Sequence, residues 1–71
     1  MKYTVILERE DDGGFHAFVP ALHGCHSQGD TLEEAVENIH EAMEAYVESL
    51  KAANEPLPDE DIYVKPVEVA A

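Results

Sequence analysis

The longest regular pattern of hydrophobic and polar positions runs from Asp30 to Asn54. Apolar residues recur there at helical spacing, and on a wheel of about 100° per residue they occupy an arc of roughly 140°. The arc consists of Leu32, Ala35, Val36, Ile39, Ala42, Met43, Tyr46, Val47 and Leu50. The pattern predicts one long amphipathic helix whose apolar stripe is buried.

Both ends of this helix carry sequence signals. Thr31 followed by Glu34 fits a capping box, in which each side chain bonds a backbone N–H at the start of the helix. Asn54, with Pro56 and Pro58 beyond it, supplies a stop, because proline cannot continue a helix. The helix is therefore expected to fill the region between these markers.

Before the helix, the pattern changes to the period of two that is typical of strands. Residues 2–10 are rich in apolar and β-branched side chains on both faces, with Tyr3, Val5 and Leu7 on one and Thr4 and Ile6 on the other. A strand with little polar surface on either face is expected in the middle of a sheet. We therefore predict a central first strand.

The next segments predict a hairpin and a third strand. Asp11–Gly14 is a turn signal, because Gly and Asp tolerate the positive φ that tight turns require. Phe15–Val19 alternates as a second, antiparallel strand that Pro20 ends. Beyond a turn at Gly24, Cys25–Gln28 is expected to be a third strand that leads into the helix.

After the helix, Ile62–Val69 is again strand-like, although Pro66 places it at a sheet edge or ends it early. The predicted order is β-β-β-α-β. This is an α+β fold, with an antiparallel sheet and one long helix packed on one of its faces.

Acidic residues dominate the polar side of the predicted helix. A second arc, from roughly 100° to 200° on the same wheel, holds Glu33, Glu34, Glu37, Glu41, Glu44 and Glu48. Their i,i+3 and i,i+4 repulsions cost roughly 1 to 2 kcal/mol in total. Two interpretations stay open: a solvated face, as in a cell with a high-salt interior, or a docking surface for a basic partner. In the second case the candidate contacts are Glu33, Glu37, Glu41, Glu44 and Glu48.

Length and composition narrow the possible functions. A chain of 71 residues forms a single domain, 1–71. Its net charge of −12 argues against direct binding to nucleic acid or to an anionic membrane. One cysteine excludes an internal disulfide, and no targeting or transmembrane segment is recognisable, so a cytoplasmic location is expected.

The predicted helix is longer than the sheet it covers. A helix of about 22 residues spans roughly 33 Å, whereas a seven-residue strand is about 23 Å long. The apolar stripe on the overhanging part of the helix must then be buried against another surface. The stripe consists of Met43, Tyr46, Val47 and Leu50, and the same holds for Ile6 and Phe18 on the other sheet face. We expect a homodimer or a higher homo-oligomer.

Three candidate chemical sites are weak. His23, Cys25 and His26 have zinc-like side chains, but a second ligand cluster at comparable spacing is lacking. Cys25 as a nucleophile would need a base in hydrogen-bond reach, and the adjacent His26 points to the opposite face of a strand. A carboxylate-metal nuclease could use Glu8, Glu10, Asp11, Asp12 and Asp30, but turns and caps already explain these acids. No catalytic residue, metal or cofactor is therefore expected.

Four motifs in order identify a resemblance. They are Asp12-Gly13-Gly14, Val19-Pro20, Gly24-Cys25 and the helix start Gly29-Asp30-Thr31-Leu32-Glu33-Glu34-Ala35. In this order and spacing the chain is similar to the HicB-like antitoxin family over nearly its whole length. Ala21 and His23 stand where the family commonly has Asp and Pro. The helix-turn-helix or ribbon-helix-helix segment of many members does not follow within these residues, so DNA binding is not expected to transfer.

The resemblance implies a fold and a partner. The family fold is β-β-β-α-β with partial likeness to an RNase H core. Its members inhibit HicA-type toxins, which are small basic ribonucleases that cleave mRNA. The resemblance thus implies a non-enzymatic antitoxin, and the alternative is an orphan oligomeric interaction module without a toxin.

Overall fold

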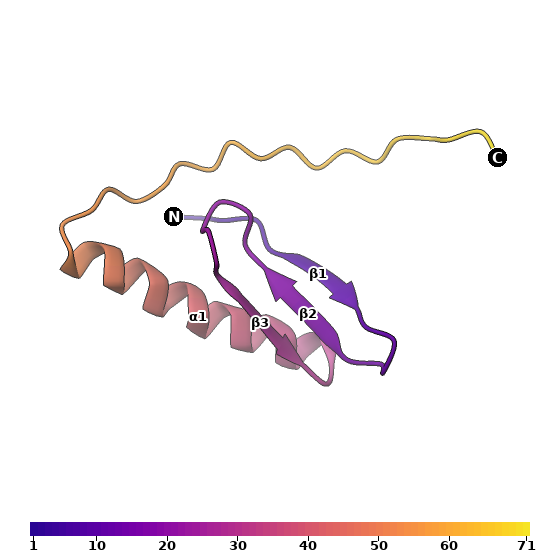
Figure 1. Cartoon of the computed structure of the whole chain (residues 1–71), viewed down its shortest axis with the longest axis horizontal. Coiled ribbons are helices and arrows are strands. Elements are labelled where there is room, and N and C mark those ends of the chain that lie inside the picture. Colours follow the sequence, from indigo (N-terminus) through magenta and orange to yellow (C-terminus); the bar gives the residue numbers. More distant parts are fainter.

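The computed structural model describes residues 1–71, which form three antiparallel strands followed by one long helix (Figure 1). Strands β1 (Ile6–Arg9), β2 (Phe15–Phe18) and β3 (His26–Gly29) form a sheet in the order β1-β2-β3. Helix α1 (Leu32–Ala52) packs on one face of this sheet, mainly over β3 and β2. The predicted α+β fold with a helix on one sheet face is confirmed.

The β1–β2 hairpin forms where the glycine-rich turn predicted it. Glu10 N–H donates to the Gly14 carbonyl at 2.7 Å, and Gly13 N–H donates back to the Glu10 carbonyl at 2.9 Å. Gly13 has a φ of 93°, which is left-handed backbone that favours glycine. Asp12 Oδ1 accepts from Gly14 N–H at 2.9 Å and fixes the turn.

Two successive turns connect β2 to β3. Leu22 N–H donates to the Val19 carbonyl at 3.0 Å, and Cys25 N–H donates to the Leu22 carbonyl at 2.9 Å. The second turn needs the positive φ of 80° at Gly24. Together the turns bury Leu22 completely and leave His23 exposed.

The helix begins and ends at the predicted signals. Thr31 Oγ1 accepts from Glu34 N–H at 3.1 Å, and Glu34 Oε1 accepts from the N–H of Asp30 at 3.2 Å. The box thus closes one residue earlier than its usual form. Asn54 ends the helix with a left-handed φ of 58°. The chain contains no helix that combines the length and the apolarity needed to cross a membrane.

The core is small and lies between α1 and the sheet. Only six of 71 residues are buried, and they are Ala17, Val19, Leu22, Cys25, Ala35 and Ile39. The partly buried side chains packed against them are Tyr3, Val5, Leu7, Ala42, Met43 and Tyr46. A core of this size leaves most of the chain's apolar surface only half covered.

Two strand predictions were wrong. The first strand begins at Ile6 rather than Lys2 and lies at an edge, because β1 pairs with β2 alone and β2 takes the centre. The predicted fourth strand, Ile62–Val69, does not form. That segment is extended but makes no backbone–backbone hydrogen bond with the sheet, and Pro66 removes one of the donors that a ladder needs.

The helix stripe is also buried differently from the prediction. Leu32 and Val36, expected inside, are 45% and 46% exposed. The distal residues expected to overhang are half-buried. From the segment before β1, Met1 and Tyr3 line a hollow together with Met43 and Val47, and Tyr3 also packs against the core. The uncovered apolar surface therefore lies at the start of α1 and not at its end.

Candidate functional site

The predicted partner-binding residues form one continuous exposed surface on α1. We call Glu33, Glu37, Glu41, Glu44 and Glu48 the acidic face, and all five are exposed. No lysine or arginine lies within ion-pair distance of them. The one basic side chain close to them is His40, whose Nδ1 is 3.6 Å from Glu44 Oε1. The negative charge of this face is therefore unneutralised by the chain itself.

An apolar strip borders the acidic face near the start of the helix. Leu32 and Val36 are nearly half exposed, and at 100° per residue Val36 lies between the buried stripe and Glu37. Apolar surface flanked by charge is the usual anatomy of a protein–protein interface. This end of α1 can thus offer both contact area and charge to a partner.

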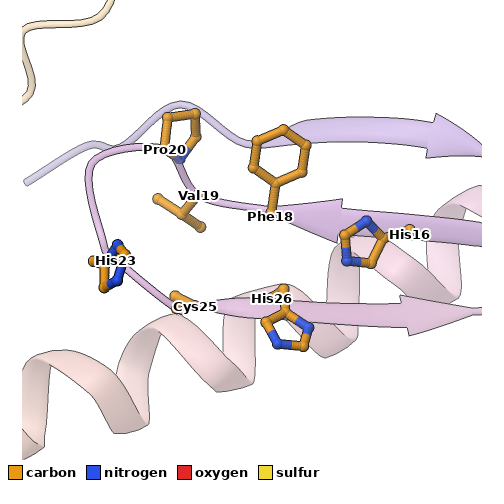
Figure 2. A pocket seen from close by; sticks show the side chains of 8 residues that line it. His16, Phe18, Val19, Pro20, His23, Cys25 and His26 are labelled. Atoms are coloured by element: carbon orange, nitrogen blue, oxygen red, sulfur yellow. The ribbon is translucent and has the colours of Figure 1, made fainter.

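The sheet face opposite α1 carries a second group of side chains, most of them partly exposed. The register pairs Ile6 with Phe18 and Phe18 with His26, so their side chains form a row across the sheet. The His16 ring centroid lies 5.9 Å from that of Phe18 and 5.6 Å from that of His26. Figure 2 shows these rings in front of the sheet with α1 behind it. They border a shallow hollow of about 420 Å³.

The structure does not bring His23, Cys25 and His26 together as metal ligands. Cys25 is 6% exposed and belongs to the core, whereas His26 stands on the open sheet face and His23 projects from the loop (Figure 2). Burial raises the pKa of the Cys25 thiol above its ordinary value of 9.0. A reactive cysteine needs a lowered pKa, so this thiol has the environment of a core side chain.

Cys25 should consequently react slowly with a thiol reagent. At pH 8 we expect labelling of the folded chain to be at least about 10-fold slower than labelling in urea. The matched control moves the thiol to the exposed loop position, His23→Cys in a Cys25→Ala background, and should label fast.

Because the folded chain holds the thiol proton of Cys25 more tightly than the unfolded chain does, the free energy of unfolding should fall as pH rises above 9.0. Cys25→Ala should remove this part of the pH dependence of the free energy of unfolding. In the labelling experiment, equal rates for the folded and the unfolded chain would contradict the burial of Cys25.

A polar hollow with four carboxylates in its lining lies at the hairpin end of the sheet. Glu10, Asp12, Asp30 and Glu34 line a polar hollow of about 470 Å³ between the hairpin and the start of α1. Asp12 already bonds Gly14 N–H, and Glu34 already bonds Asp30 N–H. These two carboxylates therefore act as turn and cap acceptors.

Comparison with known proteins identifies the family. Residues 3–68 match the family described as the HicB-like antitoxin of bacterial toxin–antitoxin systems. The chain belongs to the HicB-like antitoxin family. A UPF0150 protein of Synechocystis is 63% identical over 94% of this chain and 85% of its own length. A UPF0150 protein of Helicobacter pylori is 41% identical over 99% of this chain and 97% of its own.

The fold agrees with a solved HicB-like structure. The N-terminal domain of the Burkholderia pseudomallei antitoxin HicB matches with a TM-score of 0.73 and 27% identity, covering 93% of this chain and 74% of that one. The motifs of the resemblance have structural roles in this HicB-like chain. Gly13 and Gly24 take left-handed backbone in the two connections, and Thr31 caps the helix.

One group of residues was not predicted as a site. Alternation alone places His16 and Phe18 outward on β2, but the approach of His26 depends on the β2–β3 register. No turn signal between these strands sets that register, because the connection contains two turns rather than a tight hairpin. The open face itself was expected from Ile6 and Phe18, but the cluster of the His16, Phe18 and His26 rings on it became visible only in the structure.

Proposed function

We propose that this chain is an antitoxin that binds and inhibits a small basic HicA-type mRNA interferase and has no catalysis of its own. Membership of the HicB-like family supports a toxin partner. The observation that carries the proposal is the acidic face, five exposed glutamates without a lysine or arginine partner. Such a surface is complementary to the positive groove with which a ribonuclease holds RNA.

Charge complementarity would act first on the rate of encounter. Opposite potentials steer two proteins together and raise association rates by about 10- to 1,000-fold at low salt. The chain's net charge of −12 adds a long-range attraction for any basic protein. Binding should therefore slow as salt rises, because ions screen the attraction beyond about 10 Å at 0.1 M.

The proposed contact area centres on the first half of α1. Leu32 and Val36 would supply apolar contact, with Glu33, Glu37 and Glu41 beside them and Glu44 and Glu48 further along the helix. A basic toxin surface covered in this way could no longer admit an RNA backbone, because the acidic face would occupy the positive groove. Inhibition is thus proposed to be steric and electrostatic.

Co-purification tests this function. The untagged chain is expressed with its tagged neighbouring gene product, and the purified complex is assayed for RNA cleavage. We expect a stoichiometric complex without cleavage, and recovery of cleavage when the toxin is freed by denaturation and refolding. A chain that purifies alone beside a fully active neighbour would contradict the proposal and favour an orphan oligomeric module.

A further inference from the structure

A hollow of about 290 Å³ borders the acidic face, between the start of the chain and the second half of α1. We call it the Tyr3 hollow, and its lining includes Met1, Tyr3, Met43, Glu44, Val47 and Glu48. In Figure 1 the N-terminus lies on the same side of the molecule as the second half of α1. Pockets that hold drug-sized ligands measure about 300–1,000 Å³. A hollow of this size therefore suits one long side chain.

The lining changes from apolar to acidic across the helix. At about 100° per residue, with Leu32 as zero, Met43 and Val47 lie at about 20° and 60°, whereas Glu44 and Glu48 lie at about 120° and 160°. The two apolar side chains are partly buried and the two glutamates are exposed. The Tyr3 hollow thus spans the border between the apolar stripe and the acidic face.

Tyr3 forms a fixed aromatic wall of this hollow. Its hydroxyl donates to the Pro58 carbonyl at 2.6 Å, and its side chain packs against the core. The next residue is also held, because the Thr4 hydroxyl donates to Glu60 Oε2 at 2.9 Å. Aromatic rings attract cations as well as apolar groups. The wall opposite the helix is therefore in place before a partner arrives.

The two carboxylates favour a positively charged occupant. Glu44 and Glu48 repel one another at i,i+4, and no lysine or arginine lines the hollow or lies within ion-pair distance of either. The basic side chain in the lining is His40, whose Nδ1 is 3.6 Å from Glu44 Oε1. A cation between the two glutamates would relieve their repulsion, whereas an anion would add to it. The lining thus fits a side chain with an apolar stem and a cationic end.

A second copy of this chain is a poor source of that side chain. The sequence contains one arginine, Arg9, and its guanidinium carbon lies 5.5 Å from the Phe15 ring centroid in the β1–β2 hairpin. Two copies, each with a net charge of −12, also repel one another. A basic protein is therefore the better occupant.

We propose that the Tyr3 hollow receives an arginine side chain of the basic partner. The arginine stem lies against Met43 and Val47, and its guanidinium bonds Glu44 and Glu48 beside the Tyr3 ring. Arginine fits better than lysine, because its planar guanidinium can bond two carboxylates at once, stacks on aromatic rings and is more weakly hydrated. The partner's identity as a toxin rests on the proposed function, whereas the preference for arginine follows from the lining of the hollow.

The hollow and the apolar strip at the start of α1 fit within one interface. Val47 lies about 16 Å beyond Val36 along the helix, and a standard interface covers about 800 Å² on each partner, a patch roughly 30 Å across. One partner can therefore contact Leu32 and Val36 and also place an arginine in the hollow. Arginine is among the residues that most often carry the binding energy of an interface.

An NMR titration of the chain alone with N-acetyl-arginine amide tests the hollow. We expect saturable shifts of the Met43 and Val47 methyl signals, with a dissociation constant on the order of 1 to 10 mM for so small a ligand. N-acetyl-citrulline amide is the matched probe, because it has nearly the same shape without the charge. At equal ionic strength it should bind at least about 10-fold more weakly. Absence of saturable shifts, or equal binding of the two amides, would overturn the proposal.

Two pairs of substitutions separate the hollow from net charge. Glu44→Gln with Glu48→Gln should weaken binding of the arginine amide at least about 10-fold, because charge-assisted hydrogen bonds are lost. Glu55→Gln with Glu68→Gln removes the same charge from exposed positions outside the lining and should change the affinity less than about 2-fold. Circular dichroism checks that both variants keep the helix. Equal weakening by the two variants would mean that net charge alone attracts the probe and would overturn the proposal.

The co-purified complex then tests whether the toxin uses the hollow. Glu44→Gln with Glu48→Gln should make the complex dissociate at least about 10-fold faster, because the loss of an anchor acts mainly on the dissociation rate. An unchanged dissociation rate would overturn the hollow as an anchor site for the toxin. If no complex forms at all, the proposed function fails, while the titration still decides whether the hollow binds arginine.

Discussion

Replacing Glu37, Glu41 and Glu44 together with lysine should slow association with a basic toxin by about 10-fold or more at low salt. The three side chains are exposed on one face of α1, and none has a lysine or arginine partner whose loss would complicate the result. The variant should also lose most of the salt dependence of its association rate. Stopped-flow binding at several ionic strengths measures both effects.

The helix should tolerate this charge reversal. Lysine at position 37 pairs favourably with Glu33, and lysine at position 44 pairs with Glu48, each at i,i+4. A control variant with Glu55, Asp59 and Asp61 changed to lysine alters the net charge equally but leaves the acidic face intact. If both variants slow binding to the same degree, only net charge matters and the contact surface lies elsewhere.

Replacing Gly29 with alanine should destabilise the chain by about 1 to 3 kcal/mol or more. An added Cβ would lie 2.5 Å from the backbone nitrogen of Ala35 and 2.8 Å from the carbonyl carbon of Glu34. These are backbone atoms of the first helical turn, so the whole start of α1 must move away from β3. The clash also explains why glycine opens the G-D-T segment of this chain.

Thermal unfolding followed by circular dichroism measures this effect. For a domain of this size each kcal/mol corresponds to roughly 4 to 8 °C in melting temperature, so a loss of about 1 to 3 kcal/mol should lower the melting temperature of Gly29→Ala by about 4 to 24 °C. Gln28→Ala is the matched control, because it changes an exposed side chain and keeps the backbone carbonyl that accepts from Asn38 Nδ2 at 2.8 Å. Equal melting temperatures for the two variants would mean that the helix shifts freely.

Local signals in the sequence predicted local structure well. The hairpin, the Thr31 cap and the Asn54 stop depend on residues within a few positions of one another, and all three form as expected. The family also followed from short motifs at fixed spacing, because turns and caps restrict residue type strongly.

Predictions that depended on distant contacts were less accurate. Apolar side chains on both faces of the first strand suggested a central position for it. In the structure β2 is central instead, because it pairs with β1 on one side and with β3 on the other. Helical periodicity placed Leu32 and Val36 in the buried stripe, but it does not say where along the stripe the helix contacts β3 and β2. Both residues lie to one side of that contact and stay exposed. Residues 62–69 have strand-like alternation, but alternation does not say whether such a segment will pair with an edge of the sheet.

The order of the elements has a consequence for how this chain is made. Each of β1, β2, β3 and α1 pairs or packs against its neighbour in sequence, a topology of low contact order that favours fast folding. The side-chain hydrogen bonds that join the two ends of the chain connect Tyr3 and Thr4 to residues 58 and 60. The sheet and helix can therefore fold without waiting for residues 55–71 to find their place. A new copy therefore carries its full acidic face as soon as the helix packs on the sheet, and it needs no contact from the residues after the helix for that.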